Sequence, residues 1–214
     1  LNTVNAATAV QVTATAVTAI SGTNAQLVTL FTADGNNEIN IDGDADLTVT
    51  DTISVTQANV LNGYTTGSVT ATVSTTAIGD LDDLTETGNA YTITVATGSV
   101  TAAALNTVNA ATTVQVTATA VTAISGTNAQ LVTLFTADAN NEINIDSDAV
   151  LVVTDTITVT QANTIDAYTT GVVTATLSTT AIADLDDLTG TGNAYTITVT
   201  DSQVTAAALN TVNA

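Results

Sequence analysis

Two hydrophobic periods alternate along the chain. Apolar residues occupy every second position in four segments, with Asp51 as the one exception, a pattern typical of β-strands. These segments are residues 10–16, 47–53, 69–73 and 91–95. Threonine fills most of the intervening positions, which lie on the opposite face of a strand. The pattern therefore predicts strands with one apolar face and one face of hydroxyl groups that is exposed to solvent.

Helical spacing of apolar residues appears between these strands. Three sets predict short helices: Val55, Ala58, Leu61 and Tyr64; Ile78, Leu81 and Leu84; and Val100, Ala104, Leu105 and Val108. Thr56 and Thr101 stand where a side-chain oxygen can cap a helix. The resulting unit is a strand followed by a short helix, about 21–23 residues long apart from one acidic segment.

The sequence repeats with a period of 104 residues. The hexapeptide LNTVNA begins at positions 1, 105 and 209, and residues 1–104 match residues 105–208 at 86 positions and differ at 18. We therefore divide the chain into a first repeat (residues 1–104), a second repeat (residues 105–208) and the start of a third (residues 209–214). This division predicts a fragment of a longer array.

Short strands alternating with short helices predict a parallel β/α solenoid. One strand and one helix would form each coil, and right-handed crossovers would place successive strands in one parallel sheet. Helices this short are marginal alone, so neighbouring coils must stabilise them. The alternative is two tandem all-β immunoglobulin-like sandwiches, since a period of about 100 residues also suits that fold. The helical spacing favours the solenoid.

Composition excludes several classes of function. Among 214 residues, 20 are acidic and none is Lys, Arg, His or Cys, which gives a formal charge of −20. Without cations to contact phosphates, we expect no nucleic-acid partner. A Ser or Thr nucleophile normally needs a neighbouring base such as His or Lys, so we expect no enzyme. No apolar stretch approaches the roughly 18 residues of a membrane span, so none is expected.

Two segments rich in carboxylates, the acidic tracts at residues 34–46 and 138–148, are the candidate metal sites. Hard oxygen ligands at close spacing suit Ca²⁺, and the chain has no basic side chain to neutralise them. We predict Ca²⁺ binding by Asp34, Glu38, Asn40, Asp42, Asp44, Asp46, Asp138, Glu142, Asn144, Asp146 and Asp148, with Val150 in the place of Asp46 in the second tract. The alternative is a pair of solvated acidic loops that keep the array soluble.

Other acidic residues have simpler interpretations. Asp80, Asp82 and Asp83 recur as Asp184, Asp186 and Asp187, and their spacing places them on the outer face of a predicted helix, where early acidic residues complement the helix dipole. Asp51 and Asp155 lie within Thr-rich strands, where we expect them to close a strand end. None of these residues is predicted to be catalytic.

The strings SVTAAALNTVNAATT and VTAISGTNAQLVTLFTA resemble the repeats of very large secreted or cell-surface proteins of marine bacteria, particularly cyanobacteria. The resemblance covers nearly the whole chain. It implies an extracellular, often calcium-associated, structural or adhesive role, and it implies no catalytic residue.

These observations together predict an extracellular structural protein that forms a filament, stalk or surface layer. The expected partners are further copies of the chain, in a homopolymer or fibre, and divalent cations. The alternative is an adhesin or recognition module in which the threonine face or the acidic tracts bind a glycan, ice or a partner protein.

Overall fold

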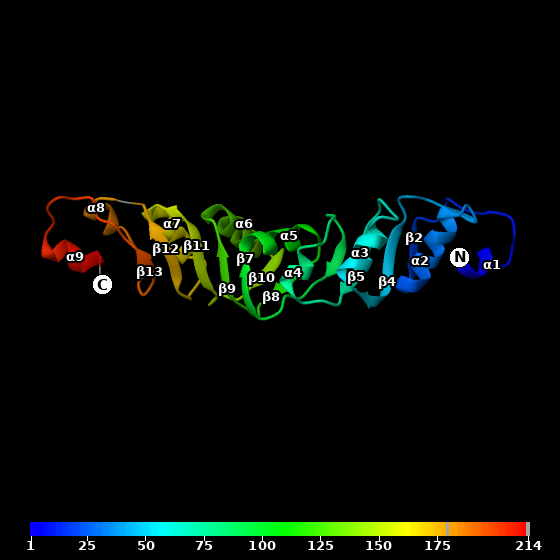
Figure 1. Cartoon of the computed structure of the whole chain (residues 1–214), viewed down its shortest axis with the longest axis horizontal. Helices are drawn as coiled ribbons and strands as arrows, with labels where there is room; N and C mark the ends of the chain where they lie inside the picture. Colours follow the sequence, from blue (N-terminus) through cyan, green and yellow to red (C-terminus); the bar gives the residue numbers. More distant parts are fainter. Residues whose placement is uncertain (179, 213–214) are drawn as a thin grey trace. The chain divides into compact units, whose positions relative to one another are not determined.

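A computed structural model describes residues 1–178 and 180–212 of the chain. The chain divides into two compact units. Figure 1 labels the helices and strands of each. Unit 1 contains Leu1–Thr94 and Thr107–Val116, and unit 2 contains Val95–Asn106 and Thr117–Ala214. The predicted third repeat, residues 209–214, lies partly outside the described residues.

Unit 1 alternates strands with helices from its first residues. Its elements are α1 (Asn2–Ala6), β1 (Val12–Ala14), β2 (Ala19–Gly22), α2 (Asn24–Gly35), β3 (Ile39–Ile41), β4 (Asp46–Ile53), α3 (Val55–Asn62), β5 (Val69–Val73), α4 (Ile78–Leu81) and β6 (Ala90–Thr92). Strands β2, β4, β5 and β6 form a sheet in the order β2-β4-β5-β6, and β1 pairs with β3. Helices α2 and α3 pack against this sheet.

Unit 2 has the same kind of organisation. Its elements are β7 (Gly98–Thr101), β9 (Val121–Gly126), α6 (Asn128–Ala139), β10 (Ile143–Ile145), β11 (Val150–Ile157), α7 (Val159–Asp166), β12 (Val173–Leu177), α8 (Ile182–Leu185), β13 (Ala194–Thr196) and α9 (Ala206–Val212). The sheet order is β13-β12-β11-β9-β7. Helix α5 (Ala102–Ala110) and strand β8 (Val116–Ala118), which pairs with β10, contribute residues to both units.

The two main sheets and the β1–β3 pair are parallel throughout. In unit 1 the residues opposite one another on successive strands are 27, 22 and 20 positions apart, as in Ile20–Leu47, Leu47–Val69 and Ala71–Tyr91. In unit 2 the corresponding offsets are 24, 27, 22 and 20. The parallel β/α class is confirmed, and the alternative of antiparallel sandwiches is wrong because helices separate the paired strands.

The spacing and the composition of the predicted unit need correction. The steps of 27 residues contain the acidic tracts, and the other steps range from 20 to 24 rather than from 21 to 23. Short additional strands, β3 and β10, follow the longest helices. The expected pattern of one strand and one helix per step therefore does not hold in the steps of 27 residues, each of which contains an additional short strand.

Local sequence explains where the main helices begin. Thr23, Ser54, Thr127 and Thr158 each cap a helix and form a reciprocal capping box with the Gln three residues later. Thr56, the predicted cap, lies inside α3 instead. The other predicted cap is correct, because Thr101 Oγ1 accepts a hydrogen bond from the backbone N–H of Ala104 at 3.1 Å. Val100 belongs to β7, not to a helix.

The interior of each unit is thin and aliphatic. Leu27 and Leu30 of α2 are almost fully buried with Ile39, Leu47 and Val69 of the strands. One aromatic pair joins consecutive helical segments in each unit: the rings of Phe31 and Tyr64 stack at 4.9 Å, and those of Phe135 and Tyr168 stack at 4.8 Å. Such pairs contribute about 0.5–1.5 kcal/mol beyond their buried area.

Buried or half-buried asparagine side chains connect consecutive steps within each unit. Asn89, which is 2% exposed, accepts a hydrogen bond from the backbone N–H of Val69 at 2.8 Å and donates one to Oδ1 of Asn62 at 3.0 Å. In unit 2, Asn193 makes the corresponding bonds with Val173 and with the carboxylate of Asp166. These bonds satisfy backbone groups that the parallel ladder leaves free, and so fix the register.

Candidate functional site

The first acidic tract begins at Asp34, near the end of α2, and runs through β3 to the first residue of β4. Asp34 Oδ1 accepts a hydrogen bond from the backbone N–H of Ile41 at 2.8 Å, and Asp46 Oδ1 accepts one from the backbone N–H of Ser68 at 2.8 Å. Glu38 accepts a hydrogen bond from Asn5 Nδ2 at 3.3 Å. Three of the six predicted ligands therefore hold neighbouring segments in place. The side chains of the others, Asn40, Asp42 and Asp44, are exposed or half-buried.

The second acidic tract repeats this arrangement with one change. Asp138 Oδ1 accepts a hydrogen bond from the backbone N–H of Ile145 at 2.9 Å, and Asn140 donates one to Glu142 at 3.4 Å. Asp146 Oδ1 accepts a bond from the backbone N–H of Asp148 at 3.5 Å, and Asn144 is exposed. Val150 cannot replace the carboxylate of Asp46, and Val172 stands at the position equivalent to Ser68.

Both tracts lack a converging ligand set. Within residues 1–178 and 180–212, no group of three or more acidic side chains is placed so that it can hold a metal ion. The structure instead gives several of these carboxylates backbone amide partners. Calcium binding by the tracts therefore stays a prediction. The ligands for such an ion would be the exposed side-chain oxygens of the tracts.

A positive φ angle shapes the turn at the start of each tract. Asn37 has a φ of 60° and Asn141 a φ of 61°, directly after the C-caps of α2 and α6. Asparagine tolerates this left-handed conformation better than most residues. The turn lets the backbone N–H of Glu38 reach the carbonyl of Ala33 at 2.9 Å and sends the chain back along the helix.

Asp51 and Asp155 have a role that the sequence did not indicate. Oδ1 of Asp51 accepts a hydrogen bond from the backbone N–H of Asn24 at 2.7 Å, and Asp155 does the same for Asn128 at 2.8 Å. Asn24 and Asn128 are the first residues of α2 and α6. Each carboxylate thus sits at the positive end of a helix from the preceding step, where its charge is favourable.

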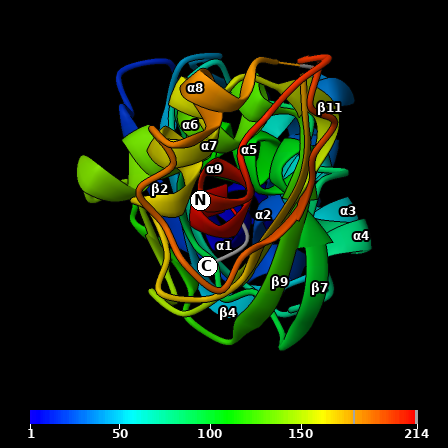
Figure 2. The same ribbon diagram turned by 90° about the vertical axis from the view of Figure 1, so that its left-hand side faces the viewer.

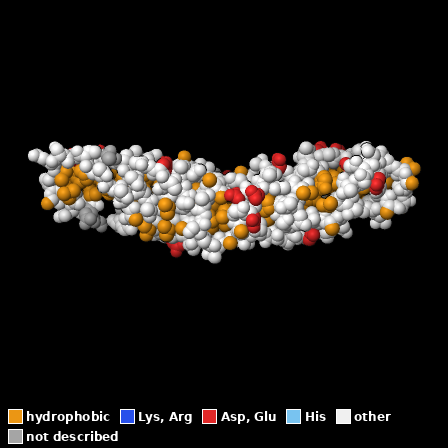
Figure 3. Space-filling view, in the orientation of Figure 1, with side chains coloured by type: hydrophobic (Ala, Val, Ile, Leu, Met, Phe, Trp, Pro, Cys, Tyr) orange, Lys and Arg blue, Asp and Glu red, His pale blue; other side chains and the backbone are white. Residues whose placement is uncertain are grey.

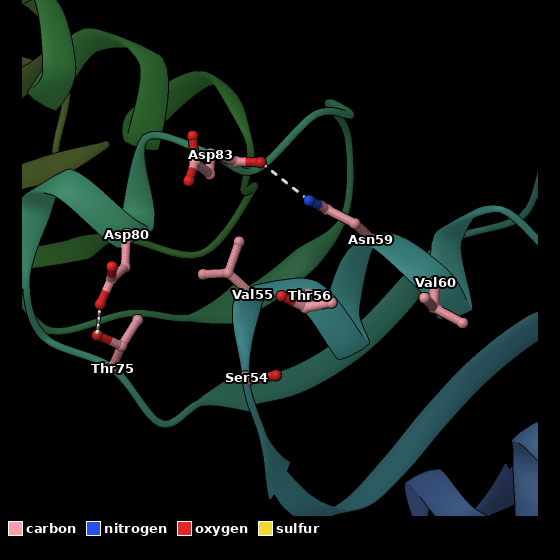
Figure 4. A pocket seen from close by; sticks show the side chains of 8 residues that line it. All are labelled: Ser54, Val55, Thr56, Asn59, Val60, Thr75, Asp80 and Asp83. Atoms are coloured by element: carbon pink, nitrogen blue, oxygen red, sulfur yellow. Dashed lines mark hydrogen bonds between the residues drawn. The ribbon is translucent and has the colours of Figure 1, made fainter.

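Asp80 and Asp83, two of the three aspartates at residues 80–83, border an open hollow of about 690 Å³ in unit 1 (Figure 4). Asp80 Oδ2 accepts a hydrogen bond from Thr75 Oγ1 at 3.0 Å, and Asn59 Nδ2 donates to the backbone carbonyl of Asp83 at 2.9 Å. The hollow is lined by Ser54, Val55, Thr56, Asn59, Val60, Thr75, Asp80 and Asp83. This lining offers hydroxyls and carboxylates, and it contains no cationic side chain.

The predicted helix that carries this group is shorter than expected. Helix α4 ends at Leu81, so Asp82 and Asp83 follow it, and Leu84 is buried beyond its end. In unit 2, Asp184 accepts a hydrogen bond from Thr180 Oγ1 at 2.8 Å, as Asp80 does from Thr75. Figure 3 shows the acidic side chains scattered over the visible surface rather than gathered in one place.

Exposed threonines lie opposite one another across adjacent strands. Thr52, Thr72 and Thr92 form one such row on β4, β5 and β6, and all three are exposed. A second row lies on β11, β12 and β13 and consists of Thr156, Thr176 and Thr196. Neighbouring strands lie about 4.8 Å apart, so each row is a regular array of hydroxyl and methyl groups.

Two tyrosines are held in the neutral form. Burial, and secondarily the charge of Glu86, raises the pKa of Tyr91 to about 12. Burial, and secondarily Asp166, raises the pKa of Tyr195 to about 12. The Tyr195 hydroxyl is buried and has no hydrogen-bond partner within the described part of the chain. A phenol with such a pKa is a poor acid or base near neutral pH.

None of the described helices is long and apolar enough to cross a membrane. Comparison of the chain with models of protein families, with curated protein sequences and with solved structures found no match in any of the three.

Proposed function

We propose that the chain is a segment of an extracellular structural protein, in which parallel β/α steps stack into a solenoid and copies associate into a filament, stalk or surface layer. The observation that carries the proposal is that contacts between consecutive steps recur at the same positions of the 104-residue period. Thr65 donates to the carbonyl of Ala45 at 2.6 Å, and Thr169 donates to that of Ala149 at 2.7 Å.

Other recurring contacts support the same interpretation. Asn59 donates to Asp83 at 2.9 Å, and Asn163 donates to Asp187 at 2.8 Å. Within each unit, consecutive steps are thus joined by side-chain hydrogen bonds as well as by the sheet. In such an array the stability is nearly a sum of unit and interface terms, so the array can lengthen without a new core.

The composition suits a role outside the cell. The chain has no Lys or Arg, so proteases of trypsin specificity find no cleavage site in it. Its charge of −20 causes self-repulsion that salt screens, since the Debye length falls to about 8 Å or less at physiological or higher ionic strength. Association is therefore expected to strengthen as the salt concentration rises.

Electron microscopy of the purified 214-residue chain, combined with sedimentation at several concentrations in high salt, tests the proposal. We expect elongated assemblies that grow with protein concentration and loosen in low salt with a chelator. Fully monomeric behaviour at every concentration and salt level would contradict self-association. Particles consisting of two independently tumbling globules would contradict the solenoid.

Calcium is a separate part of the proposal. We propose that the exposed oxygens of the acidic tracts bind Ca²⁺ and stiffen the array, supported by the supply of hard oxygen ligands without internal cations. Calorimetric titration with CaCl₂ is expected to give saturable heat that falls in the double variant Asp42→Asn, Asp44→Asn. No heat, together with an unchanged melting temperature in chelator, would refute it.

A second candidate function is recognition of a repeating surface by the threonine rows. Thr52, Thr72 and Thr92 lie in register and exposed, and they present a regular array to a crystalline polysaccharide or to ice. Co-sedimentation with insoluble polysaccharides and a thermal-hysteresis assay test this function. A recognition module would bind saturably as a monomer and lose binding in Thr72→Lys, whereas an assembly element would polymerise without any ligand.

A further inference from the structure

The outer face of the unit 2 sheet is apolar around β11 and β12. In this sheet β7 pairs with β9, as Figure 2 shows, and β11 and β12 follow in order. Leu151 and Val173 point inward and are fully buried, whereas Val150 and Val172 on the opposite face are 36% and 42% exposed. Val152, two residues after Val150, is half-buried on the same face. We call Val150, Val152 and Val172 the valine patch.

The strand register makes the valine patch continuous. Leu151 lies opposite Val173, and the backbone N–H of Leu151 donates to the carbonyl of Val172 at 3.0 Å, so Val172 lies beside Val150. On the other side of β11, Val150 lies opposite Ala123 of β9, which is half-buried. Apolar side chains thus continue from β9 across β11 to the start of β12, on strands that lie about 4.8 Å apart.

Unit 1 has polar residues at the same three positions. Asp46, Thr48 and Ser68 stand where unit 2 has the valine patch. Oδ1 of Asp46 accepts a hydrogen bond from the backbone N–H of Ser68 at 2.8 Å, and the side chains of Asp46 and Thr48 are exposed. Unit 1 therefore forms the same strands with a polar outer face, so the fold itself does not require valine at these positions.

The residues beneath the valine patch are the same in both units. Four pairs of buried, inward-facing residues are identical: Leu47 and Leu151, Val49 and Val153, Val69 and Val173, and Ala71 and Ala175. The change from polar to apolar residues therefore affects the solvent-facing side of the sheet and leaves these core residues as they are. An apolar side chain gains free energy when it is removed from water, so the patch is stabilised when another surface covers it.

Charge determines which surface can cover the valine patch. The chain has 20 carboxylates and no Lys, Arg or His, so two copies repel each other wherever acidic side chains meet. The valine patch has no counterpart of the Asp46 carboxylate, whereas the same face of unit 1 would bring that carboxylate into a contact that offers no cation. Burying an unpaired charge is costly. The face of a second copy that matches the patch in charge is therefore the valine patch itself.

We propose that the outer face of β11 and β12 in one copy packs against the same face of a second copy, with the two valine patches at the centre of the contact. The inference rests on the proposed self-association and names a surface for it. Both copies use the same patch, so the contact is two-fold symmetric and closes as a pair. Sheets that pack in this way lie about 10 Å apart, with the side chains of the two faces interdigitated.

The size of the face predicts a weak contact. Strand β11 has eight residues and belongs to a sheet of five strands, so the face measures at most about 26 Å along the strands and about 20 Å across them. The contact is therefore at most about 500 Å² per copy, below the roughly 800 Å² per partner of a standard interface. We expect pairs that form at high protein concentration. High salt should favour them, because it screens the acidic residues at the rim, Asp148 and Asp155.

Unit 1 supplies the test variant. Val150→Asp, Val172→Ser gives unit 2 the pair of residues that unit 1 has at positions 46 and 68, so the variant is expected to fold. Val150→Thr, Val172→Ser removes the apolar groups without adding a charge. Val60→Thr is the matched control, because Val60 is a 43% exposed valine on α3 and unit 2 has Thr164 at the equivalent position.

Sedimentation velocity of each 214-residue variant over a concentration series in about 1 M NaCl measures association, and circular dichroism checks folding. We expect both double variants to weaken association by at least about tenfold, because each substitution acts twice in a symmetric contact. Val60→Thr is expected to leave association unchanged. The converse variant, Asp46→Val, Ser68→Val, gives unit 1 a similar apolar face and is expected to strengthen association.

The outcomes separate this inference from the proposed filament. Assemblies that form equally well in the wild type and in both double variants would overturn the valine patch as an interface and leave self-association standing. A wild type that forms only pairs, which both double variants abolish, would support the patch and contradict the filament. A wild type that stays monomeric throughout would overturn both.

Two further results would also count against the valine patch. If only the charged double variant weakens association, general repulsion explains the loss. If Val60→Thr weakens association as much as the double variants do, general loss of exposed apolar surface explains it. Binding of a monomeric wild type to an insoluble polysaccharide, lost in the double variants, would assign the patch to that partner instead of a second copy.

Discussion

Removing the buried carboxamide of Asn89 tests whether polar side chains between steps hold the fold together. Asn89 is 2% exposed, accepts from the backbone N–H of Val69 at 2.8 Å, and donates to Asn62 at 3.0 Å. Asn89→Ala leaves the amide of Val69 buried without an acceptor. That penalty is about 1–3 kcal/mol, and the lost bond to Asn62 adds about 1 kcal/mol, so we expect a loss of about 2–4 kcal/mol.

Two further variants separate hydrogen bonding from packing. Asn62→Asp reproduces the pair that unit 2 already uses, in which Asn193 donates to the carboxylate of Asp166, so we expect a change within about 0.5 kcal/mol. Asn89→Asp keeps an acceptor for Val69 but turns a carboxylate toward the oxygen of Asn62. It is therefore expected to destabilise the protein although its shape is nearly unchanged.

Urea unfolding followed by far-ultraviolet circular dichroism measures these differences, and hydrogen exchange of the Val69 amide localises them. We expect the Val69 amide to lose protection in Asn89→Ala and to keep it in Asn62→Asp. An Asn89→Ala protein within about 0.5 kcal/mol of the wild type, with Val69 still protected, would refute the reasoning. Equal losses in Asn62→Asp and Asn89→Asp would show that charge, not the direction of the hydrogen bond, decides the outcome.

Three other predictions follow from the structure. Gly67→Ala is expected to cost about 1–3 kcal/mol in urea unfolding, because its Cβ would overlap the carbonyl oxygen of Asp44, whereas Gly43→Ala, with no atom within 4 Å, stays within about 0.5 kcal/mol. Stability is expected to fall as the pH rises from 10 to about 12, because tyrosine in the unfolded chain ionises near 10, whereas Tyr91 in the folded chain ionises near 12. The free energy of unfolding, measured with urea, should drop by up to about 1.4 kcal/mol per pH unit for each such tyrosine, and Tyr91→Phe should remove its share of the slope while the share of Tyr195 remains. Asp51→Asn is expected to cost about 0.5–1 kcal/mol at low salt and less in 1 M NaCl, since it removes a charge from the N-terminus of α2; a loss independent of salt would contradict that account.

The class of fold could be predicted from two periodicities of apolar residues in the sequence, the alternation typical of strands and the spacing typical of helices. Predicted strands at residues 47–53 and 69–73 correspond to β4 and β5, and the predicted helix around Val55 corresponds to α3. These segments have one apolar face and one polar face, so local pattern and tertiary burial agree. The predicted strands at 10–16 and 91–95 are shorter in the structure, where they correspond to β1 (Val12–Ala14) and β6 (Ala90–Thr92).

The longest helix of each unit was not predicted, although its signals are present. Thr23 and Gln26 form a capping box, and Leu27, Leu30 and Phe31 follow at helical spacing. The threonines in this segment resemble those of the strands, but Thr29 and Thr32 donate to the carbonyls of Ala25 and Val28 and remain helical. Because strands and helices of this chain have a similar composition, composition does not show where β2 ends and α2 begins. The capping box is the better indication of the first residue of the helix.

The placement of the acidic residues was the least predictable part. Asp51 caps a helix that begins 27 residues before it, and no local pattern specifies that partner. Asp34 and Asp46 accept backbone bonds from segments that meet only after the chain has turned. Such contacts depend on the register between neighbouring steps. The 104-residue period shows which positions of the two repeats are equivalent, but it does not show which residues face one another across steps.

The lack of basic side chains explains why backbone amides take this role. With 20 carboxylates and no Lys, Arg or His, the chain cannot pair its charges with side-chain cations. Six aspartates instead accept hydrogen bonds from backbone N–H groups of residues at least seven positions away in the sequence: Asp34, Asp46, Asp51, Asp138, Asp155 and Asp201. A hydrogen bond to a charged acceptor is worth about 1.5–3 kcal/mol, and it needs no second side chain to be ordered. Two of these contacts recur at equivalent positions of the two repeats: Asp34 and Asp138 make one, and Asp51 and Asp155 make the other.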